Sequence, residues 1–331
     1  MADQTIYIFS NGVLERRGNT LCLNSEEEKK YLPVETVGSI LAFGEISVNK
    51  RVLELLSKQE ILLHYFNYYG YYMGTFYPRE HYNSGYMILR QAEYYMDMDK
   101  RLVLAKAFVK GAIGNMVRVM RYYLNRGKDL EEVLEQIDQL AGAVESCNTI
   151  NELMAIEGNV RNWYYKGFDQ IINDPEFQFE SRTRRPPQNK LNVLISFANS
   201  LVYATVLSEI YKTHLDPRIG YLHSTNNRRF SLNLDVAEIF KPILADRLIF
   251  STIGHRIIQK TSFDQERKGL LLKESARKKF VQAFDERLAE TIQHNKLNRK
   301  VSYRELIRLE LYKLQKHFMG EGNYTPFIAR W

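Results

Sequence analysis

The sequence predicts an α+β protein in which a β-rich N-terminal domain, residues 1–83, precedes a larger α-helical domain, residues 84–331. Two observations predict this division. Short apolar runs separated by turn residues fill the first part of the chain, whereas long segments with a helical apolar repeat follow after about Ser84. A length of 331 residues also exceeds that of one average domain.

The first part has the pattern of short strands joined by turns. Ile6–Phe9 is an apolar run of strand length, and Asn11-Gly12 after it is typical of a tight hairpin turn because both residues tolerate positive φ. Further strands are expected at 21–23, 37–43, 61–66 and 71–77. Ser47 is a preferred helix-capping residue and predicts a short helix that ends near Ser57.

The second part consists of long segments with helical periodicity. Helices are expected at 87–97, 101–125, 130–144, 149–168, 190–212, 231–250, 274–294 and 302–318, of which 190–212 is strongly apolar and expected to be central. Thr149 with Glu152, and Ser302 with Glu305, form capping boxes at two of the helix starts. Pro242 is expected to bend its helix, because proline lacks a backbone N–H.

The charge of the chain is unevenly distributed. The formal net charge is +7; the first 80 residues carry −2 and the remainder +9. A basic part of this size predicts a polyanionic partner such as DNA, although an ordinary basic protein is the alternative. Cys22 and Cys147 match no metal-ligand or redox spacing. Because the sequence has neither a signal peptide nor a membrane-spanning apolar run, we expect a cytoplasmic protein that does not bind membranes.

Several familiar catalytic motifs are absent from the sequence. It contains no G-x-x-x-x-G-K-[ST] phosphate loop, no G-x-G-x-x-G fingerprint, no H-E-x-x-H, no C-x-x-C and no G-x-S-x-G. These absences argue against nucleotide hydrolysis, dinucleotide redox chemistry, structural zinc and acyl transfer at a serine. Carboxylates and one histidine remain as candidates for chemistry.

The first candidate is Glu157, which lies in an apolar helical segment beside Gly158. A glutamate in such a segment is costly to bury without a partner. Gly158 lowers helix propensity, a cost that the close approach of a ligand or another backbone segment would explain. The alternative is that Glu157 pairs at the surface with Arg161, one helical turn away.

The other candidates lie further along the chain. His223 ends an apolar run and precedes a polar, basic loop, where it could face a phosphate; a purely structural histidine is the alternative. Asp235 and Glu238 share one helical face, and a cation or a basic partner would relieve their repulsion. The alternative is a solvated acidic face balanced by Lys241.

Together these residues suit a hard divalent cation. The carboxylates of Glu157 and Glu238 with the imidazole of His223 fit Mg²⁺ or Mn²⁺ better than a metal that prefers thiolates. Such a cation polarises a phosphate oxygen and stabilises a leaving oxyanion. The hypothesis is therefore a metal-dependent enzyme that cuts and rejoins DNA phosphodiesters.

Three motifs in this sequence resemble those of the Cas1 family, the CRISPR-associated endonuclease/integrase of spacer acquisition. They are Met154–Gly158 followed by Tyr164-Tyr165, Gly220–Ser224, and Ser231–Pro242. The resemblance covers the whole chain. It implies an N-terminal β-domain and a C-terminal helical domain that holds a metal site.

The resemblance also implies roles and partners. Glu157, His223 and Glu238 correspond to the metal ligands, with Asp235 beside them as a supporting catalytic carboxylate. The implied protein is a homodimer that binds the small ferredoxin-like protein Cas2 and inserts short pieces of foreign DNA into a CRISPR array. In that reaction a 3′-hydroxyl of the incoming double-stranded DNA attacks a phosphodiester at the repeat boundary.

One departure from the family concerns an arginine. Many relatives carry it five residues after the first glutamate, where this chain has Asn162, and the adjacent Arg161 is expected to replace it. Residues expected to contact DNA are Arg161, Tyr164, Tyr165, Arg228, Arg229 and Lys241, with Arg182, Arg184, Arg185 and the basic residues between Lys296 and Lys316 as further candidates.

Two other functions remain open at this point. One is a general structure-specific DNA nuclease used in repair, which would employ the same chemistry. The other is a basic helical DNA-binding module without catalysis, in which Glu157, His223 and Glu238 would lie apart and bind no ion.

Overall fold

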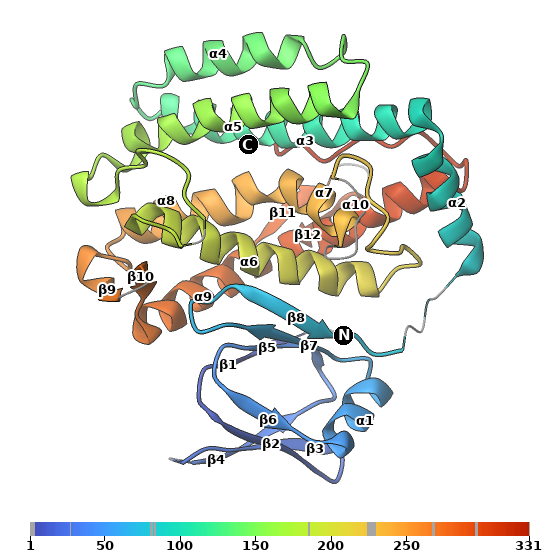
Figure 1. Cartoon of the computed structure of the whole chain (residues 1–331), viewed down its shortest axis with the longest axis vertical. Coiled ribbons are helices and arrows are strands. Elements are labelled where there is room, and N and C mark those ends of the chain that lie inside the picture. The colour runs from blue at the N-terminus through green and yellow to red at the C-terminus, as the bar shows by residue number, and fades with distance from the viewer. Residues whose placement is uncertain are drawn as a thin grey trace. The chain divides into compact units, whose positions relative to one another are not determined.

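The computed structural model describes residues 4–26, 28–79, 82, 84–184, 186–223, 230–266, 269–294 and 297–330 (Figure 1). It confirms the predicted α+β class, because a β-rich N-terminal part precedes a mainly helical C-terminal part. The chain forms two compact units, Met1–Asn83 and Ser84–Trp331.

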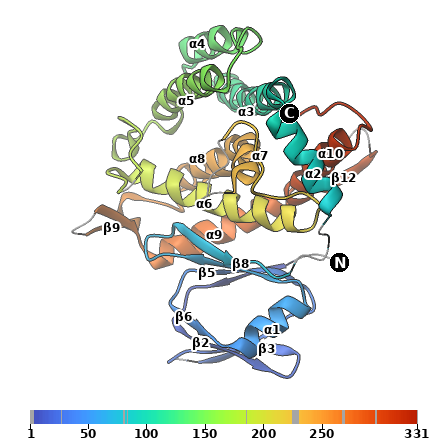
Figure 2. The ribbon, with the colours of Figure 1, turned by 45° about the vertical axis from the view of Figure 1, so that its right-hand side comes forward.

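The N-terminal unit contains two four-stranded sheets. One has the order β1-β5-β7-β8, formed by Gln4–Ile8, Val37–Ala42, Leu62–Phe66 and Tyr72–Phe76. The other has the order β4-β3-β2-β6, formed by Lys29–Pro33, Thr20–Asn24, Gly12–Arg17 and Ile46–Val48. The sheets and helix α1 (Lys50–Lys58) bury their apolar side chains in one core, with α1 at one side of the layers (Figures 1 and 2).

Helix α1 begins later than the sequence predicts. Ser47 lies in strand β6, and the cap is Asn49, whose Oδ1 accepts a hydrogen bond of 3.2 Å from the backbone N–H of Val52. Ser47 is held in the sheet because β6 pairs in parallel with β2. Serine and asparagine are both preferred caps, so strand pairing decides between them.

The C-terminal unit consists mainly of helices. They are α2 (Gly85–Met96), α3 (Met98–Leu124), α4 (Glu131–Gly142), α5 (Ile150–Ile172), α6 (Lys190–Tyr211), α7 (Ser231–Lys241), α8 (Arg247–Gly254), α9 (Glu274–Ala289) and α10 (Tyr303–Phe318). Two hairpins, β9–β10 and β11–β12, are formed by Phe263–Glu266, Gly269–Leu272, Thr291–His294 and Arg299–Ser302. Helix α7 packs against both α3 and α6, and α3 packs against α5 (Figures 1 and 2).

Helix α6 is central to this unit. Among the described residues it is the one helix that is long and apolar enough to cross a membrane, but 78% of the 18-residue window concerned is buried inside the protein. This burial identifies α6 as a core helix, as its apolar sequence predicts. Its start is capped by Asn189, whose Oδ1 accepts a hydrogen bond of 2.8 Å from the backbone N–H of Asn192.

Two helix boundaries differ from the prediction. The helix expected to reach His294 ends at Ala289, because Thr291–His294 pairs with Arg299–Ser302 in a hairpin. At Pro242 the chain stays helical: Pro242–Asp246 forms a π-helical turn between α7 and α8. The missing N–H of proline is thus accommodated within a widened turn, at the place where the sequence predicts a bend.

A buried histidine lies in the first sheet of the N-terminal unit. His64 on β7 is fully buried, and its Nδ1 lies 2.7 Å from Thr75 Oγ1 on the neighbouring strand β8. Burial lowers the pKa of His64 from 6.5 to about 3. The folded unit therefore keeps this imidazole neutral over a pH range in which an unfolded chain would protonate it.

We predict that the N-terminal unit loses stability as the pH falls below 6.5. Between pH 6.5 and about 3 the unfolded state binds a proton on His64 that the folded state does not, so the free energy of unfolding falls by about 1.4 kcal/mol per pH unit. Hydrogen exchange of the β7 and β8 amides in the full chain at pH 7.5 and 5.5, corrected for intrinsic rates, measures this loss. The same pH dependence in His64→Asn would assign it to another group.

Candidate active site

Helix α5 positions the first glutamate of the site. Its N-terminus is fixed by Thr149, whose Oγ1 accepts a hydrogen bond of 3.2 Å from the backbone N–H of Glu152. Two turns further on, Glu157 and Arg161 lie on one face, with Arg161 Nε and Nη2 at 2.7 and 2.5 Å from Glu157 Oε1. The side chains of this pair are only 13% and 11% exposed, so the pair is not the solvated surface pair of the alternative interpretation.

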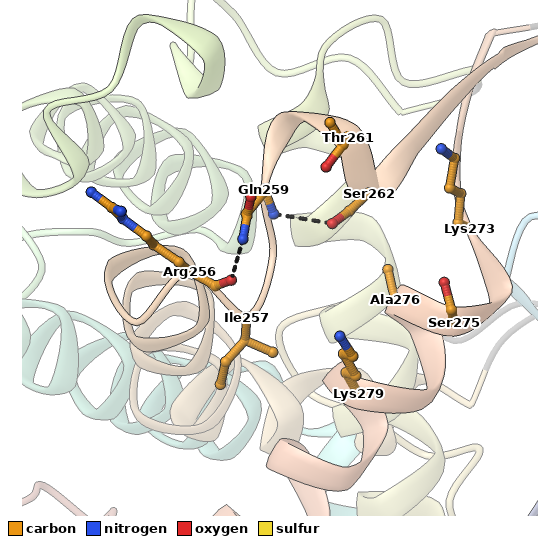
Figure 3. Close-up of a pocket in the computed structure, with 9 residues that line it drawn as sticks. All are labelled: Arg256, Ile257, Gln259, Thr261, Ser262, Lys273, Ser275, Ala276 and Lys279. Carbon is orange, nitrogen blue, oxygen red and sulfur yellow. Dashed lines mark hydrogen bonds between the residues drawn. The ribbon is translucent and has the colours of Figure 1, made fainter.

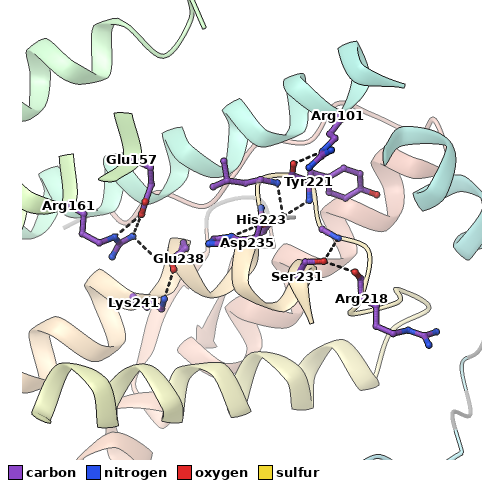
Figure 4. Close-up of polar contacts among 12 residues, drawn as sticks. Arg101, Glu157, Arg161, Arg218, Tyr221, His223, Ser231, Asp235, Glu238 and Lys241 are labelled. Carbon is purple, nitrogen blue, oxygen red and sulfur yellow. Dashed lines mark hydrogen bonds and ion pairs between the residues drawn. The ribbon is translucent and has the colours of Figure 1, made fainter. Parts of the chain in front are cut away.

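Helix α7 brings the second glutamate to the same guanidinium. Arg161 Nη2 lies 2.5 Å from Glu238 Oε2, and Lys241 donates to Glu238 Oε1 (Figure 4). Burial raises the pKa of Glu238, but the charges of Arg161 and Lys241 outweigh it and hold that pKa well below its usual range. Glu238 is thus an ionised carboxylate in an almost closed environment, and not part of a solvated acidic face.

Asp235 organises the segment that carries His223. Its carboxylate accepts hydrogen bonds from the backbone N–H groups of Tyr221, Leu222 and His223 at 2.6, 3.1 and 3.0 Å. The His223 Nδ1 lies 2.8 Å from the same carboxylate (Figure 4). Because an ionised carboxylate can only accept, Nδ1 carries the proton of this bond. Burial lowers the pKa of His223, but the hydrogen bond to Asp235 and the charges of Asp235 and Glu238 together outweigh burial and raise that pKa.

Three further residues hold this segment: Gly220 and Ser231, which begin two of the family motifs, and Arg101, which the sequence did not indicate. Ser231 Oγ accepts a hydrogen bond of 2.9 Å from the Gly220 N–H and donates one of 2.5 Å to the Arg218 carbonyl. A side chain at Gly220 would meet the Ser231 backbone at 2.5 Å, so only glycine fits there. Arg101 Nε donates to the Tyr221 carbonyl at 2.9 Å, a contact that joins helix α3 to a segment distant in the sequence.

The structure therefore brings the predicted residues into one network. Glu157 and Glu238 share a guanidinium, and Asp235 lies one helical turn before Glu238 on α7. The charge of Glu238 contributes to the raised pKa of His223, so these two groups are electrostatic neighbours. In the part of the chain that the structure describes, no three His, Cys, Asp or Glu side chains are grouped closely enough to hold a metal ion.

Two expectations for α5 are not met. Among the described residues nothing lies within 4 Å of the position that a Cβ of Gly158 would take, so no approach of another backbone segment explains this glycine. Tyr164 and Tyr165 are 0% and 3% exposed, and both rings pack against Phe168. Rings buried in this way present no open face to a DNA base, so neither tyrosine is retained as a DNA contact.

The other predicted DNA contacts lie in different environments. Arg161 is occupied by the two glutamates, and Lys241 by Glu238. Arg182 donates to Asn192 Oδ1 at 2.9 Å and to Ser196 Oγ at 3.0 Å, so it holds the loop before α6 against that helix. Arg184 is exposed. The remaining predicted contacts that lie outside the described residues are Arg185, Arg228, Arg229 and Lys296.

A separate pocket of about 230 Å³ lies between the end of α8 and the start of α9 (Figure 3). Gln259 shapes one wall: its backbone N–H donates to Ser262 Oγ at 3.0 Å and its Nε2 to the Arg256 carbonyl at 2.9 Å. Three cationic side chains line the pocket, namely Arg256, Lys273 and Lys279. The sequence does not indicate this group of cations, because the three residues come together only in the folded chain.

The chain matches a known protein family. The family model described as CRISPR associated protein Cas1 matches residues 6–286. This chain belongs to the Cas1 family. A CRISPR-associated endonuclease Cas1 of Thermodesulfovibrio yellowstonii is 59% identical over 328 residues, 99% of each chain. The structure of a Cas1 protein from Thermotoga maritima has a TM-score of 0.90 and 46% identity, covering 98% of this chain and 100% of that one.

These similarities confirm the family predicted from the three motifs, the endonuclease activity and the function in spacer acquisition. More distant Cas1 structures share the fold. One is a Cas6-RT-Cas1–Cas2 complex, with a TM-score of 0.86 and 16% identity, covering 99% of this chain and 36% of that one. Another is a Cas1–DNA complex, with a TM-score of 0.59 and 17% identity, covering 95% and 92%.

We predict that Asp235→Asn loosens the segment that carries His223. The amide places N–H donors against backbone N–H groups, so roughly 2–3 kcal/mol of local stability is lost. Exchange of the amides at 221–223 should speed up at least about 30-fold, since each 1.4 kcal/mol is a factor of ten. The same substitution at Asp138, whose partner Arg121 is exposed, serves as control. Unchanged protection in Asp235→Asn would contradict this role.

Proposed function

We propose that this Cas1 chain joins DNA strands at a site in which Glu157, His223 and Glu238 hold Mg²⁺ or Mn²⁺. The observation that carries the proposal is that two nearly buried glutamates from different helices, α5 and α7, meet at one cation, the Arg161 guanidinium. Burying two carboxylates side by side is unfavourable unless a positive charge is shared between them. The pair is therefore suited to a cation.

The donor chemistry of these residues suits a hard divalent cation. Carboxylate oxygens are the ligands that Mg²⁺ and Mn²⁺ prefer, and Glu157 and Glu238 each direct an oxygen to one point. The bond from His223 Nδ1 to Asp235 leaves Nε2 as the ligating nitrogen, an arrangement common among metal-binding histidines. When bound, a divalent cation lowers the pKa of an attacking hydroxyl and stabilises charge on the phosphate.

The remaining steps depend on groups of the chain itself. Asp235 keeps the His223 ring in one orientation and one tautomer. Lys241, held by Glu238, places an ammonium where the charge of a phosphate is to be balanced. In strand joining, the 3′-hydroxyl of one DNA end forms a new P–O bond and loses its proton, while the P–O bond of the target breaks and the departing oxygen gains one.

The proposed partners follow from the positive charge of the chain and from its membership of the Cas1 family. The part of the chain after residue 80 carries +9, which favours binding of double-stranded DNA from the spacer precursor and from the CRISPR repeat. Cas1 chains with this fold occur in a complex with Cas2 and in a complex with DNA. We therefore propose a cytoplasmic homodimer that binds Cas2 and DNA.

The general repair nuclease is not retained, because the chain belongs to the Cas1 family, which acts in spacer acquisition. Activity assays distinguish the two functions. A preference for target DNA that carries a repeat, increased by Cas2, favours spacer integration, whereas equal activity on any branched DNA favours repair. The non-catalytic DNA-binding module is not retained, because the relatives over the full length of the chain are endonucleases.

We predict that Glu157→Gln and Glu238→Gln each lower strand joining by at least about 100-fold, because each removes one charged ligand while keeping its shape. DNA affinity should change by less than about twofold, since phosphate contacts depend on Lys and Arg. Gel assays of joining and a binding titration measure the two quantities. Glu152→Gln, on an exposed turn of the same helix α5, is the matched control. Wild-type joining by Glu157→Gln would reject the ligand assignment.

We also predict that the basic pocket takes part in DNA binding. The double variant Arg256→Gln/Lys279→Gln should weaken DNA affinity and reduce the slope of log affinity against log salt by about two, because up to two phosphate contacts are lost. Lys29→Gln/Lys30→Gln, on the exposed strand β4, removes the same charge and serves as control. Equal effects of the two double variants would mean that only net charge matters.

A further inference from the structure

Arg161 occupies the carboxylate oxygens that a metal ion needs. Its Nη2 lies 2.5 Å from both Glu157 Oε1 and Glu238 Oε2. A divalent cation that binds both glutamates must therefore displace this guanidinium. The Arg161 side chain is only 11% exposed, and a buried guanidinium without a counter-charge is strongly unfavourable. A displaced Arg161 needs another carboxylate nearby.

Asp246 is a buried carboxylate that can still accept a hydrogen bond. It is 1% exposed, and among the described residues its Oδ2 has no hydrogen-bond partner. Burial raises the pKa of Asp246 to about 7, although the charge of Arg161, the Tyr164 hydroxyl and the charge of Lys241 each lower it. Tyr164 lies three residues after Arg161 on α5, one helical turn away on the same face. Asp246 thus faces α5 within reach of the Arg161 charge.

The π-helical turn explains why Asp246 has this position. The backbone N–H of Arg247 bonds to the Pro242 carbonyl, five residues back, so this turn contains one residue more than an α-helical turn. The extra residue rotates everything after it around the helix axis. In a regular helix Ala245 would lie on the same face as Glu238 and Lys241. The widened turn instead brings the next residue, Asp246, toward this face. Turns of this kind are frequent at functional sites.

We propose that Asp246 is a positioning residue that receives the Arg161 guanidinium when a divalent cation takes over Glu157 and Glu238. Arg161 then has two carboxylate environments: the glutamate pair without metal, and Asp246 with metal. The exchange keeps the Arg161 guanidinium paired with a carboxylate in both states. Asp246 thereby sets how readily the site takes up its ion. This inference rests on the proposed metal site and adds a determinant of its affinity.

The test is a double-mutant cycle on Mn²⁺ binding, measured by calorimetry or by the EPR signal of free Mn²⁺. Asp246→Asn should weaken Mn²⁺ binding at least about 10-fold, because Arg161 loses its second partner. In the Arg161→Gln background, Asp246→Asn should change Mn²⁺ binding by less than about twofold, since no guanidinium needs to be received. Asp246→Glu, which keeps the charge, should retain most of the affinity.

Two comparison variants separate this role from a structural one. Asp169→Asn changes another carboxyl on α5, one that accepts a hydrogen bond from the Phe179 backbone, and should leave Mn²⁺ affinity unchanged. Tyr164→Phe removes the hydroxyl next to Asp246 but no charge, and it should also leave Mn²⁺ affinity unchanged. If Asp246→Asn weakens binding equally with and without Arg161, or not at all, the inference is overturned. Unaltered Mn²⁺ binding by Glu157→Gln would instead overturn the proposed metal site.

Discussion

The buried contact of Arg161 with Glu157 and Glu238 is the interaction on which the chemistry of the helical unit depends. Helices α5 and α7 each contribute a carboxylate that would be unstable in this environment alone. The Arg161 guanidinium between them and Lys241 beside Glu238 balance these two charges, and the shared guanidinium ties the two helices together at this point. Under the proposed function the same contact prepares a cation site, because two carboxylates that share one positive group can present their oxygens to another cation.

Asp235 shows how a carboxylate can support the site without being a ligand. Its oxygens accept three backbone N–H groups and the Nδ1–H of His223, so its acceptor capacity is used within the protein. The segment before His223 is thereby tied to α7, the helix that carries Glu238. A single ionised side chain fixes the imidazole relative to the second glutamate, which is the kind of support that metal sites commonly require.

Local patterns in the sequence predicted part of this arrangement. The spacing of Glu157 and Arg161 predicted their shared face, and the resemblance to Cas1 linked Glu157 with Glu238. Periodicity could not reveal that Arg161 bonds to both glutamates, because that contact joins two helices distant in sequence. Periodicity also could not reveal that Tyr164 and Tyr165, which were expected to contact DNA, are buried. Ser47 failed as a helix cap because strand pairing, a tertiary effect, placed it in β6.

A crystal structure of the full chain soaked with Mn²⁺, with anomalous diffraction recorded, tests directly whether Glu157, Glu238 and His223 hold the ion. We expect one anomalous peak in contact with these three residues, and an Arg161 side chain that no longer bridges the two glutamates. A peak at any other place, or Arg161 still bonded to both glutamates at Mn²⁺ concentrations that support strand joining, would contradict it.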